Sequence, residues 1–237
     1  MTRALEVPTK SPPDRLRRAP MPAWIPPMLA TLTDQLPTEG TWVYEPKLDG
    51  VRGLIYVSGG TVRIFSRNRK LLNDAYPELV EGLSDAVRGD AVLDGEIVAF
   101  DPEHGITSFA RLQQRMQLRD PVRARRSQVA VHLYLFDCMY HEGIDLTGLP
   151  LLERKAVLKD IVRDADPIRL TPFSTTGAAA QDQVPSPAGA RHRRLHCSPG
   201  LARTAGGATG GPLRRETAAL CGQGRHRIRP PDARTPP

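Results

Sequence analysis

Apolar and polar positions alternate regularly between residues 41 and 173. Five segments show period-two alternation or short apolar runs, as strands do: 42–47, 52–57, 61–65, 91–100 and 129–136. Three segments have apolar residues three and four apart, as helices do: 74–87, 108–118 and 151–162. Ser58-Gly59-Gly60 predicts a hairpin turn. Asp74 and Ser108 are the expected N-caps of the first two helices.

The pattern changes at both ends of this region. Residues 1–20 are expected to be an irregular leader, and 21–177 a partial domain into which Pro26-Pro27-Met28-Leu29-Ala30 leads. Residues 178–237 have neither period, and they contain no Phe, Trp, Tyr, Lys or Met. Because such a segment has little apolar surface to offset its ordering entropy, we expect a disordered basic tail.

The same tail composition has a second interpretation. A segment rich in Arg, Pro, Gly and Ala is typical of a shifted reading frame through GC-rich coding DNA, or of truncation of the original domain. The nucleotide sequence around codon 177 separates these hypotheses, since a shifted frame would restore a regular pattern in a different register.

Charge and cysteine content narrow the class of protein. The net charge of the whole chain is +7, and residues 181–237, with ten arginines and three acidic residues, hold all of this excess. Cys138, Cys197 and Cys221 have no metal-site or disulfide spacing, and no apolar run approaches 18 residues. We therefore expect a cytoplasmic protein with no membrane association.

The segment Glu45-Pro-Lys-Leu-Asp-Gly-Val-Arg52 has the form K-x-D-G-x-R, with the lysine at position 47. A strand, a lysine and a glycine turn would bring an amine close to a phosphate. Since lysine has a reference pKa of about 10.4, a nucleophilic lysine needs its pKa lowered by about 3 units through burial or nearby positive charge. An exposed hairpin turn is the structural alternative.

Four further motifs follow in order: Ser66-Arg67-Asn68, Leu93-Asp94-Gly95-Glu96, Ser108-Phe109-Ala110-Arg111-Leu112-Gln113-Gln114-Arg115 and Tyr134-Leu135-Phe136-Asp137. Together with the K-x-D-G-x-R segment, this set closely resembles the adenylation domain of ATP-dependent DNA ligases, particularly the bacterial type built from a bare ligase core. The resemblance covers residues 21–177. It implies an α+β fold, an ATP-grasp-like nucleotidyltransferase domain of antiparallel sheets and flanking helices.

The resemblance also implies roles for single residues. Lys47 matches the nucleophile that attacks the α-phosphate of ATP, and Glu45 matches a contact to the adenine. Phe136 matches the aromatic residue that stacks on the adenine ring, where an apolar face excludes water.

Three more residues match the part of the family's site that holds the sugar and phosphates. Arg52 and Arg67 match arginines that bind ribose and phosphate oxygens, and guanidinium groups are well suited to phosphates. Glu96 matches the acidic residue that contacts the ribose or a metal ion. ATP with Mg²⁺ (or Mn²⁺) is the implied cofactor set.

In the family, AMP passes from the lysine to a DNA 5′-phosphate, and a nick in double-stranded DNA is then sealed during repair or recombination. A monomeric enzyme is expected. The family continues with E-G-x-x-x-K and K-x-K segments and an OB-fold domain, and residues 178–237 match none of them. We therefore expect impaired sealing, because charged groups at the phosphates are lost.

Three alternatives stay open. The chain could be a non-catalytic pseudo-ligase that only binds nucleotide or DNA. It could also be an RNA ligase or a capping-type nucleotidyltransferase, since both share the K-x-D-G core. The third alternative treats the arginine-rich tail as a DNA-binding arm.

Overall fold

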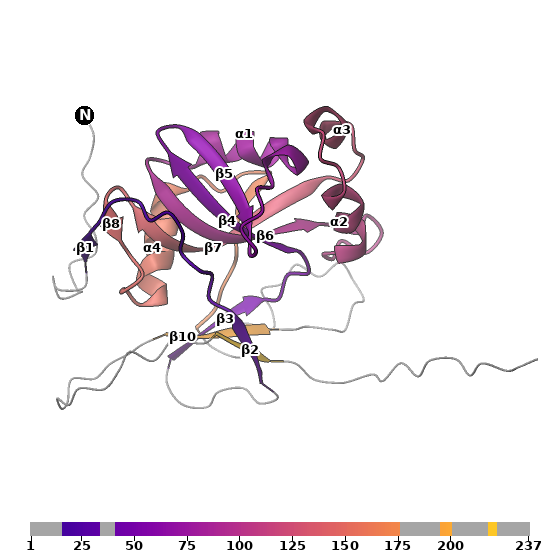
Figure 1. Ribbon diagram of the computed structural model, residues 1–237. Coiled ribbons are helices and arrows are strands. Elements are labelled where there is room, and N and C mark those ends of the chain that lie inside the picture. The colour runs from indigo at the N-terminus through magenta and orange to yellow at the C-terminus, as the bar shows by residue number, and fades with distance from the viewer. Residues whose placement is uncertain (1–15, 34–40, 176–194, 201–217, 222–237) are drawn as a thin grey trace, which may run out of the picture.

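The computed structural model describes residues 16–33, 41–175, 195–200 and 218–221, which form two sheets and flanking helices (Figure 1). The larger sheet has seven strands: β1 (Arg17–Arg18), β4 (Val51–Ser58), β5 (Thr61–Ser66), β6 (Ala91–Ala99), β7 (Val131–His141), β8 (Ile144–Asp145) and β9 (Ile168–Leu170). Their order is β1-β8-β7-β6-β4-β5, and β9 pairs in parallel with β7. The other pairings are antiparallel.

The smaller sheet combines segments from the two ends of the chain. It consists of β2 (Ala30–Thr33), β3 (Thr41–Pro46), β10 (Leu195–Gly200) and β11 (Ala218–Cys221), in the order β2-β11-β10-β3. The expectation of a disordered 178–237 does not hold for β10 and β11. Strand pairing uses backbone N–H and carbonyl groups, which depend little on side-chain type, so β10 pairs with β3 without a side-chain pattern. The rest of that tail lies outside the described residues.

Within the described ranges, five short helical segments accompany the sheets: η2 (Asn73–Ala75), α1 (Pro77–Ala86), α2 (Phe109–Met116), α3 (Pro121–Arg125) and α4 (Leu151–Ile161). The predicted cap at Asp74 is wrong, because a 3₁₀ turn contains this residue and α1 begins at Pro77. Proline suits a first helical position, where its missing N–H has no intrahelical partner. The predicted cap at Ser108 is confirmed, since its Oγ accepts from Arg111 N.

The main core lies between the large sheet and its helices. Odd-numbered residues of β4 and β6 meet the apolar sides of α1 and α4 in one cluster, which includes Ile55, Val57, Leu79, Leu83, Leu93, Ile97, Leu158 and Ile161. The predicted α+β class with antiparallel sheets is confirmed. The hairpin is also confirmed, since Gly59 and Gly60 have φ angles of 53° and 76° that suit glycine.

The opposite face of the large sheet is covered by the segment before β2. Even-numbered Leu54 and Tyr56 of β4 pack in a second cluster with Trp24 and Ile25 among their neighbours. The Tyr56 hydroxyl accepts a hydrogen bond from Ile25 N at 2.9 Å, and the Trp24 ring stacks on Tyr56. This face continues past Leu54 to Arg52, and the polar residues of the motifs gather there.

No helix within the described ranges has the length and apolar character needed to cross a membrane.

Candidate functional site

The K-x-D-G-x-R segment connects the two sheets. Glu45 belongs to β3 of the smaller sheet, and Arg52 belongs to β4 of the larger one. Lys47 lies in the connection between these strands with a half-buried side chain. The lysine therefore occupies the point where the chain passes from one sheet to the other.

Contacts on both sides hold this connection. A Cβ added to Gly50 would lie 2.1 Å from the Ile97 carbonyl oxygen, so the connection approaches β6 more closely than any side chain permits. Asp49 N donates to Thr107 Oγ1 at 3.0 Å, and Asp49 Oδ2 accepts from Phe109 N at 3.2 Å. The motif aspartate thus attaches the lysine connection to the start of α2.

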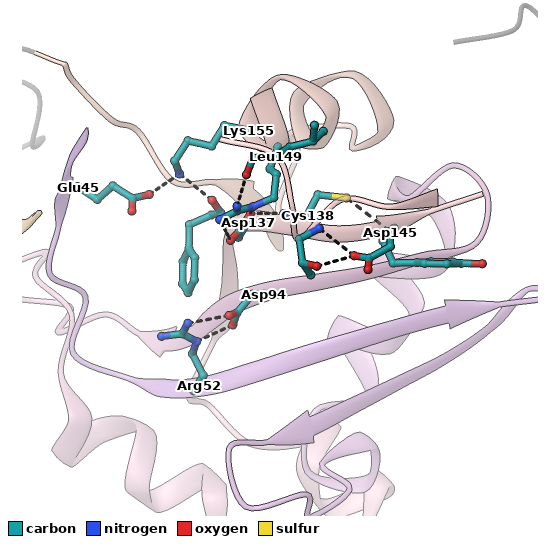
Figure 2. Close-up of polar contacts among 12 residues, drawn as sticks. Glu45, Arg52, Asp94, Asp137, Cys138, Asp145, Leu149 and Lys155 are labelled. Carbon is teal, nitrogen blue, oxygen red and sulfur yellow. Dashed lines mark hydrogen bonds and ion pairs between the residues drawn. The ribbon is translucent and has the colours of Figure 1, made fainter. Parts of the chain in front are cut away.

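Arg52 forms a two-point ion pair with Asp94 on β6 (Figure 2). Its Nη2 also donates to the Met28 carbonyl oxygen at 3.4 Å, and its Cζ lies 4.6 Å from the centre of the Phe136 ring. Burial raises the pKa of Asp94, while the neighbouring guanidinium opposes that rise. The arginine expected to hold ribose or phosphate is therefore bound to a carboxylate in this structure.

Glu96 lies on the same sheet face. It is directly opposite Arg52 in the β4–β6 register and two residues beyond Asp94 along β6. Burial raises the pKa of Glu96 to about 7; the carboxylate of Asp94 adds to the rise, whereas Arg52 and Lys47 oppose it. The site thus has a carboxylate that changes charge near neutral pH within electrostatic reach of the lysine.

Glu45 is bound to a lysine that the motif comparison did not select. Lys155 Nζ on α4 lies 2.6 Å from Glu45 Oε1, and it donates to the Phe136 carbonyl oxygen at the same distance. Both side chains are buried, with Lys155 5% exposed. Burial raises the pKa of Glu45, and Lys155 opposes that rise. In the sequence, the available sign of this residue was that Lys155 shares one side of the predicted helix 151–162 with leucines.

A second buried ion pair supports the middle of β7. Arg154 Nε and Nη2 bind the two carboxylate oxygens of Asp137 at 2.8 and 2.9 Å. The same guanidinium donates to the Leu149 carbonyl oxygen at 2.6 Å (Figure 2). Consecutive residues of α4 thus bind consecutive residues of β7, Arg154 through Asp137 and Lys155 through Phe136.

The structure does not bring every predicted residue into this cluster. Arg67 lies in the exposed turn after β5 and has no side-chain hydrogen bond or ion pair to a described residue. Arg115, the last residue of the α2 motif, is buried; its Nη2 binds the Glu78 carboxylate and its Nε donates to the Ala75 carbonyl oxygen. Its role is to attach α2 to α1.

The carboxylates could serve as partial ligands of a divalent cation. Among the described residues, no three His, Cys, Asp or Glu side chains are grouped as a complete metal site. Glu96 and Asp49 are close enough to interact electrostatically. Magnesium is commonly held by one or two carboxylates together with substrate phosphates, so this donor set fits a cation shared with a bound nucleotide.

A cleft of about 500 Å³ lies beside α4 and contains none of the six residues predicted from the motifs. Its walls include Lys155 together with Lys159, Thr171 and Phe173. The cleft therefore adjoins the buried Glu45–Lys155 pair and is not the space around Lys47.

The chain is similar to known ligases. Residues 27–182, more than half of the chain, match the family described as ATP dependent DNA ligase domain. A DNA ligase of Pyrobaculum neutrophilum is 41% identical over 55% of this chain and 23% of its own length. The multifunctional non-homologous end joining protein LigD of Pseudomonas aeruginosa is 38% identical over 67% of this chain and 18% of its own length.

A solved structure shares the fold. The structure titled mycobacterial DNA ligase D complexed with ATP and MES has a TM-score of 0.54 and 22% identity, over 82% of this chain and 60% of that chain. This chain spans less than a quarter of either curated relative. The matched family agrees with the ordered motifs and favours DNA ligase over the RNA ligase and capping-type alternatives. The chain belongs to the ATP-dependent DNA ligase domain family.

Proposed function

We propose that this chain is the nucleotide-binding part of an ATP-dependent DNA ligase, with Lys47 as the residue that receives AMP. The observation that carries the proposal is the position of Lys47 at the junction of the two sheets, within electrostatic reach of Glu96. Positioning and charge stabilisation are the main requirements of phosphoryl transfer.

The reaction is a displacement at phosphorus. The Lys47 nitrogen forms a bond to the α-phosphorus of ATP, the bond from that phosphorus to the bridging oxygen breaks, and pyrophosphate leaves. The amine loses its proton to a solvent water molecule. AMP remains on the lysine as a phosphoramidate.

The adenine lies near Glu45 and Phe136 in this proposal. Glu45 supplies a buried carboxylate oxygen, and Phe136 supplies an aromatic ring. Lys155 binds both the Glu45 carboxylate and the main-chain carbonyl oxygen of Phe136. Arg52, which already contacts the Phe136 ring, is the guanidinium that we assign to the ribose and α-phosphate.

Mg²⁺ or Mn²⁺ would be held by Glu96 together with the phosphates, with Asp49 close by. When bound, the cation would neutralise charge on the phosphates.

The second substrate is nicked double-stranded DNA, whose 5′-phosphate receives the AMP. Arg67, exposed and unbound to described residues, is available for that phosphate. Sealing by a monomeric cytoplasmic enzyme, in repair or recombination, belongs to the same proposal. Because residues 178–237 contain no lysine to hold the triphosphate, we expect sealing to be weak.

The experiment is covalent labelling. The chain is incubated with ATP radiolabelled at the α-phosphate and with Mg²⁺ or Mn²⁺, and the modified peptide is located by mass spectrometry. Label on Lys47 that is absent from Lys47→Ala supports the proposal. The matched control is Lys70→Ala, an exposed lysine after β5, which should label as the unaltered chain does.

The non-catalytic alternative has its own readout. If ATP raises the unfolding temperature of both the unaltered chain and Lys47→Ala while neither becomes labelled, the chain is a binding domain only. If ATP neither labels nor stabilises the chain, the proposed function is wrong.

A further inference from the structure

We propose that Lys155 is a positioning residue that sets nucleotide specificity by holding the Glu45 carboxylate as a hydrogen-bond acceptor for the 6-amino group of adenine. This inference rests on the proposed function, because it takes Glu45 to face the adenine. It adds a residue on α4, outside the five motifs, to the determinants of the site.

The geometry places Lys155 between the two elements that would contact the base. Its Nζ binds Glu45 Oε1 and the Phe136 carbonyl oxygen, each at 2.6 Å, and so joins β3 to the middle of β7 (Figure 2). It also lies 5.1 Å from the centre of the Phe173 ring. Lys155 and Glu45, which are 110 positions apart in sequence, are thus held together through one ammonium group.

The neighbouring Arg154–Asp137 ion pair restricts the position of this ammonium group. Arg154 is bound to Asp137 by two hydrogen bonds and to the Leu149 carbonyl oxygen by a third. Since α4 is attached to β7 at the adjacent residue, Lys155 has little freedom to leave Glu45. The Glu45–Lys155 pair is also shielded from most solvent, since Lys155 is 5% and Glu45 9% exposed.

An ionised carboxylate can only accept hydrogen bonds. With Oε1 bound to Lys155, Oε2 would favour a ligand atom that carries a proton, such as the 6-amino group of adenine. A purine with no donor at position 6 would leave Oε2 desolvated and unpaired, which lowers the affinity for that analogue. Without the lysine, burial would favour the protonated carboxyl group, which can donate as well as accept, so the selection would be lost.

The test compares ATP with purine riboside triphosphate, which lacks only the 6-amino group. Affinities for both are measured by calorimetry with the unaltered chain, Lys155→Met and Lys159→Met. We expect Lys155→Met to reduce the preference for ATP by about tenfold, the cost of a hydrogen bond to a charged group. Lys159→Met, an exposed lysine one turn further along α4, should keep the preference.

A second variant separates loss of folding from loss of nucleotide preference. Lys155→Met leaves Glu45 buried without its partner, whereas Glu45→Gln/Lys155→Met removes both charges, so the double variant should unfold at a higher temperature than the single one. It should nevertheless lack the preference for the 6-amino group.

The two proposals fail in different ways. An unchanged preference in a folded Lys155→Met chain overturns the role of Lys155 and leaves the proposed function intact. An unaltered chain that binds ATP and purine riboside triphosphate equally also overturns the specificity role. An unaltered chain that binds neither nucleotide overturns the proposed function and this inference with it.

Discussion

Arg52 on β4 and Asp94 on β6 form a two-point ion pair, with Nε 2.5 Å from Oδ1 and Nη2 2.7 Å from Oδ2. The arginine is the last residue of the K-x-D-G-x-R motif, and the aspartate belongs to the Leu93-Asp94-Gly95-Glu96 motif. The pair therefore joins two motifs that lie 42 positions apart in sequence. Asp94 is 2% exposed, whereas the Arg52 side chain is 24% exposed, so the carboxylate is the buried member of the pair.

Asp94→Asn should destabilise the fold, because the guanidinium keeps its charge and loses the carboxylate that balances it. We expect a loss of roughly 3 kcal/mol in the free energy of unfolding, measured by urea denaturation. Glu81→Gln, which removes an exposed partner of Arg125, should change the stability little. Equal effects of the two substitutions would show that the buried pair contributes no more than a surface pair.

Gly50→Ala should disturb the lysine connection, since the new Cβ would meet the Ile97 carbonyl oxygen at 2.1 Å. We expect destabilisation of roughly 2–3 kcal/mol by overpacking. Displacement of the lysine should reduce labelling by ATP by about 100-fold. Thermal unfolding and the labelling assay measure these two effects.

Gly53→Ala is the matched control for that substitution. A Cβ at Gly53 would have its nearest contact, with Ile64 Cγ2, at 3.5 Å, which is an ordinary van der Waals distance. Its stability should stay within about 1 kcal/mol of the unaltered chain. If Gly53→Ala labels as poorly as Gly50→Ala, close approach to β6 is not the reason for the glycine in the motif.

Glu96 should make stability depend on pH between about 4.5 and 7. Its pKa rises from 4.5 to about 7 on folding, so its favourable contribution is fully present below 4.5 and is lost as the pH rises through 7. Relative to Glu96→Gln, the free energy of unfolding of the unaltered chain should fall by on the order of 3 kcal/mol across this pH window. Denaturation of both proteins at several pH values from 5 to 8 measures the difference.

An exposed carboxylate gives the opposite sign in the same experiment. Arg125 lowers the pKa of Glu81, so the stabilising contribution of Glu81 is lost as the pH falls. The difference between the unaltered chain and Glu81→Gln should therefore shrink toward acidic pH. A pH-independent difference for Glu96→Gln would mean that Glu96 is solvated in the folded chain.

The sequence predicted most of the regular elements between 41 and 173 and the order of the motifs. Alternation in β4 and β6 was readable because each strand buries one face against the core, and burial selects apolar side chains at every second position. The Ser108 cap was readable because its side chain bonds a backbone N–H only three residues away. The helix start at Pro77 was not, because Asp74 has the residue type of a cap without the backbone position of one.

The contacts of the site depended on the tertiary structure. The β4–β6 register sets Arg52 opposite Glu96, and Asp94, two residues before Glu96, takes up the guanidinium that the motif assigned to ribose or phosphate. Sheet order and the packing of α4 set Lys155 against Glu45.

By itself, the sequence determined which residue types stand at which positions of each strand, helix and motif, since burial and local hydrogen bonding act over a few residues. Only the tertiary structure decided which charged groups neutralise one another. Ion pairs form over a few ångströms between side chains 42 or 110 positions apart, and their choice depends on strand register and helix packing. For the same reason Arg67, which has the sequence signature of the site, lies in an exposed turn, while Lys155, which lacks it, is bound to Glu45.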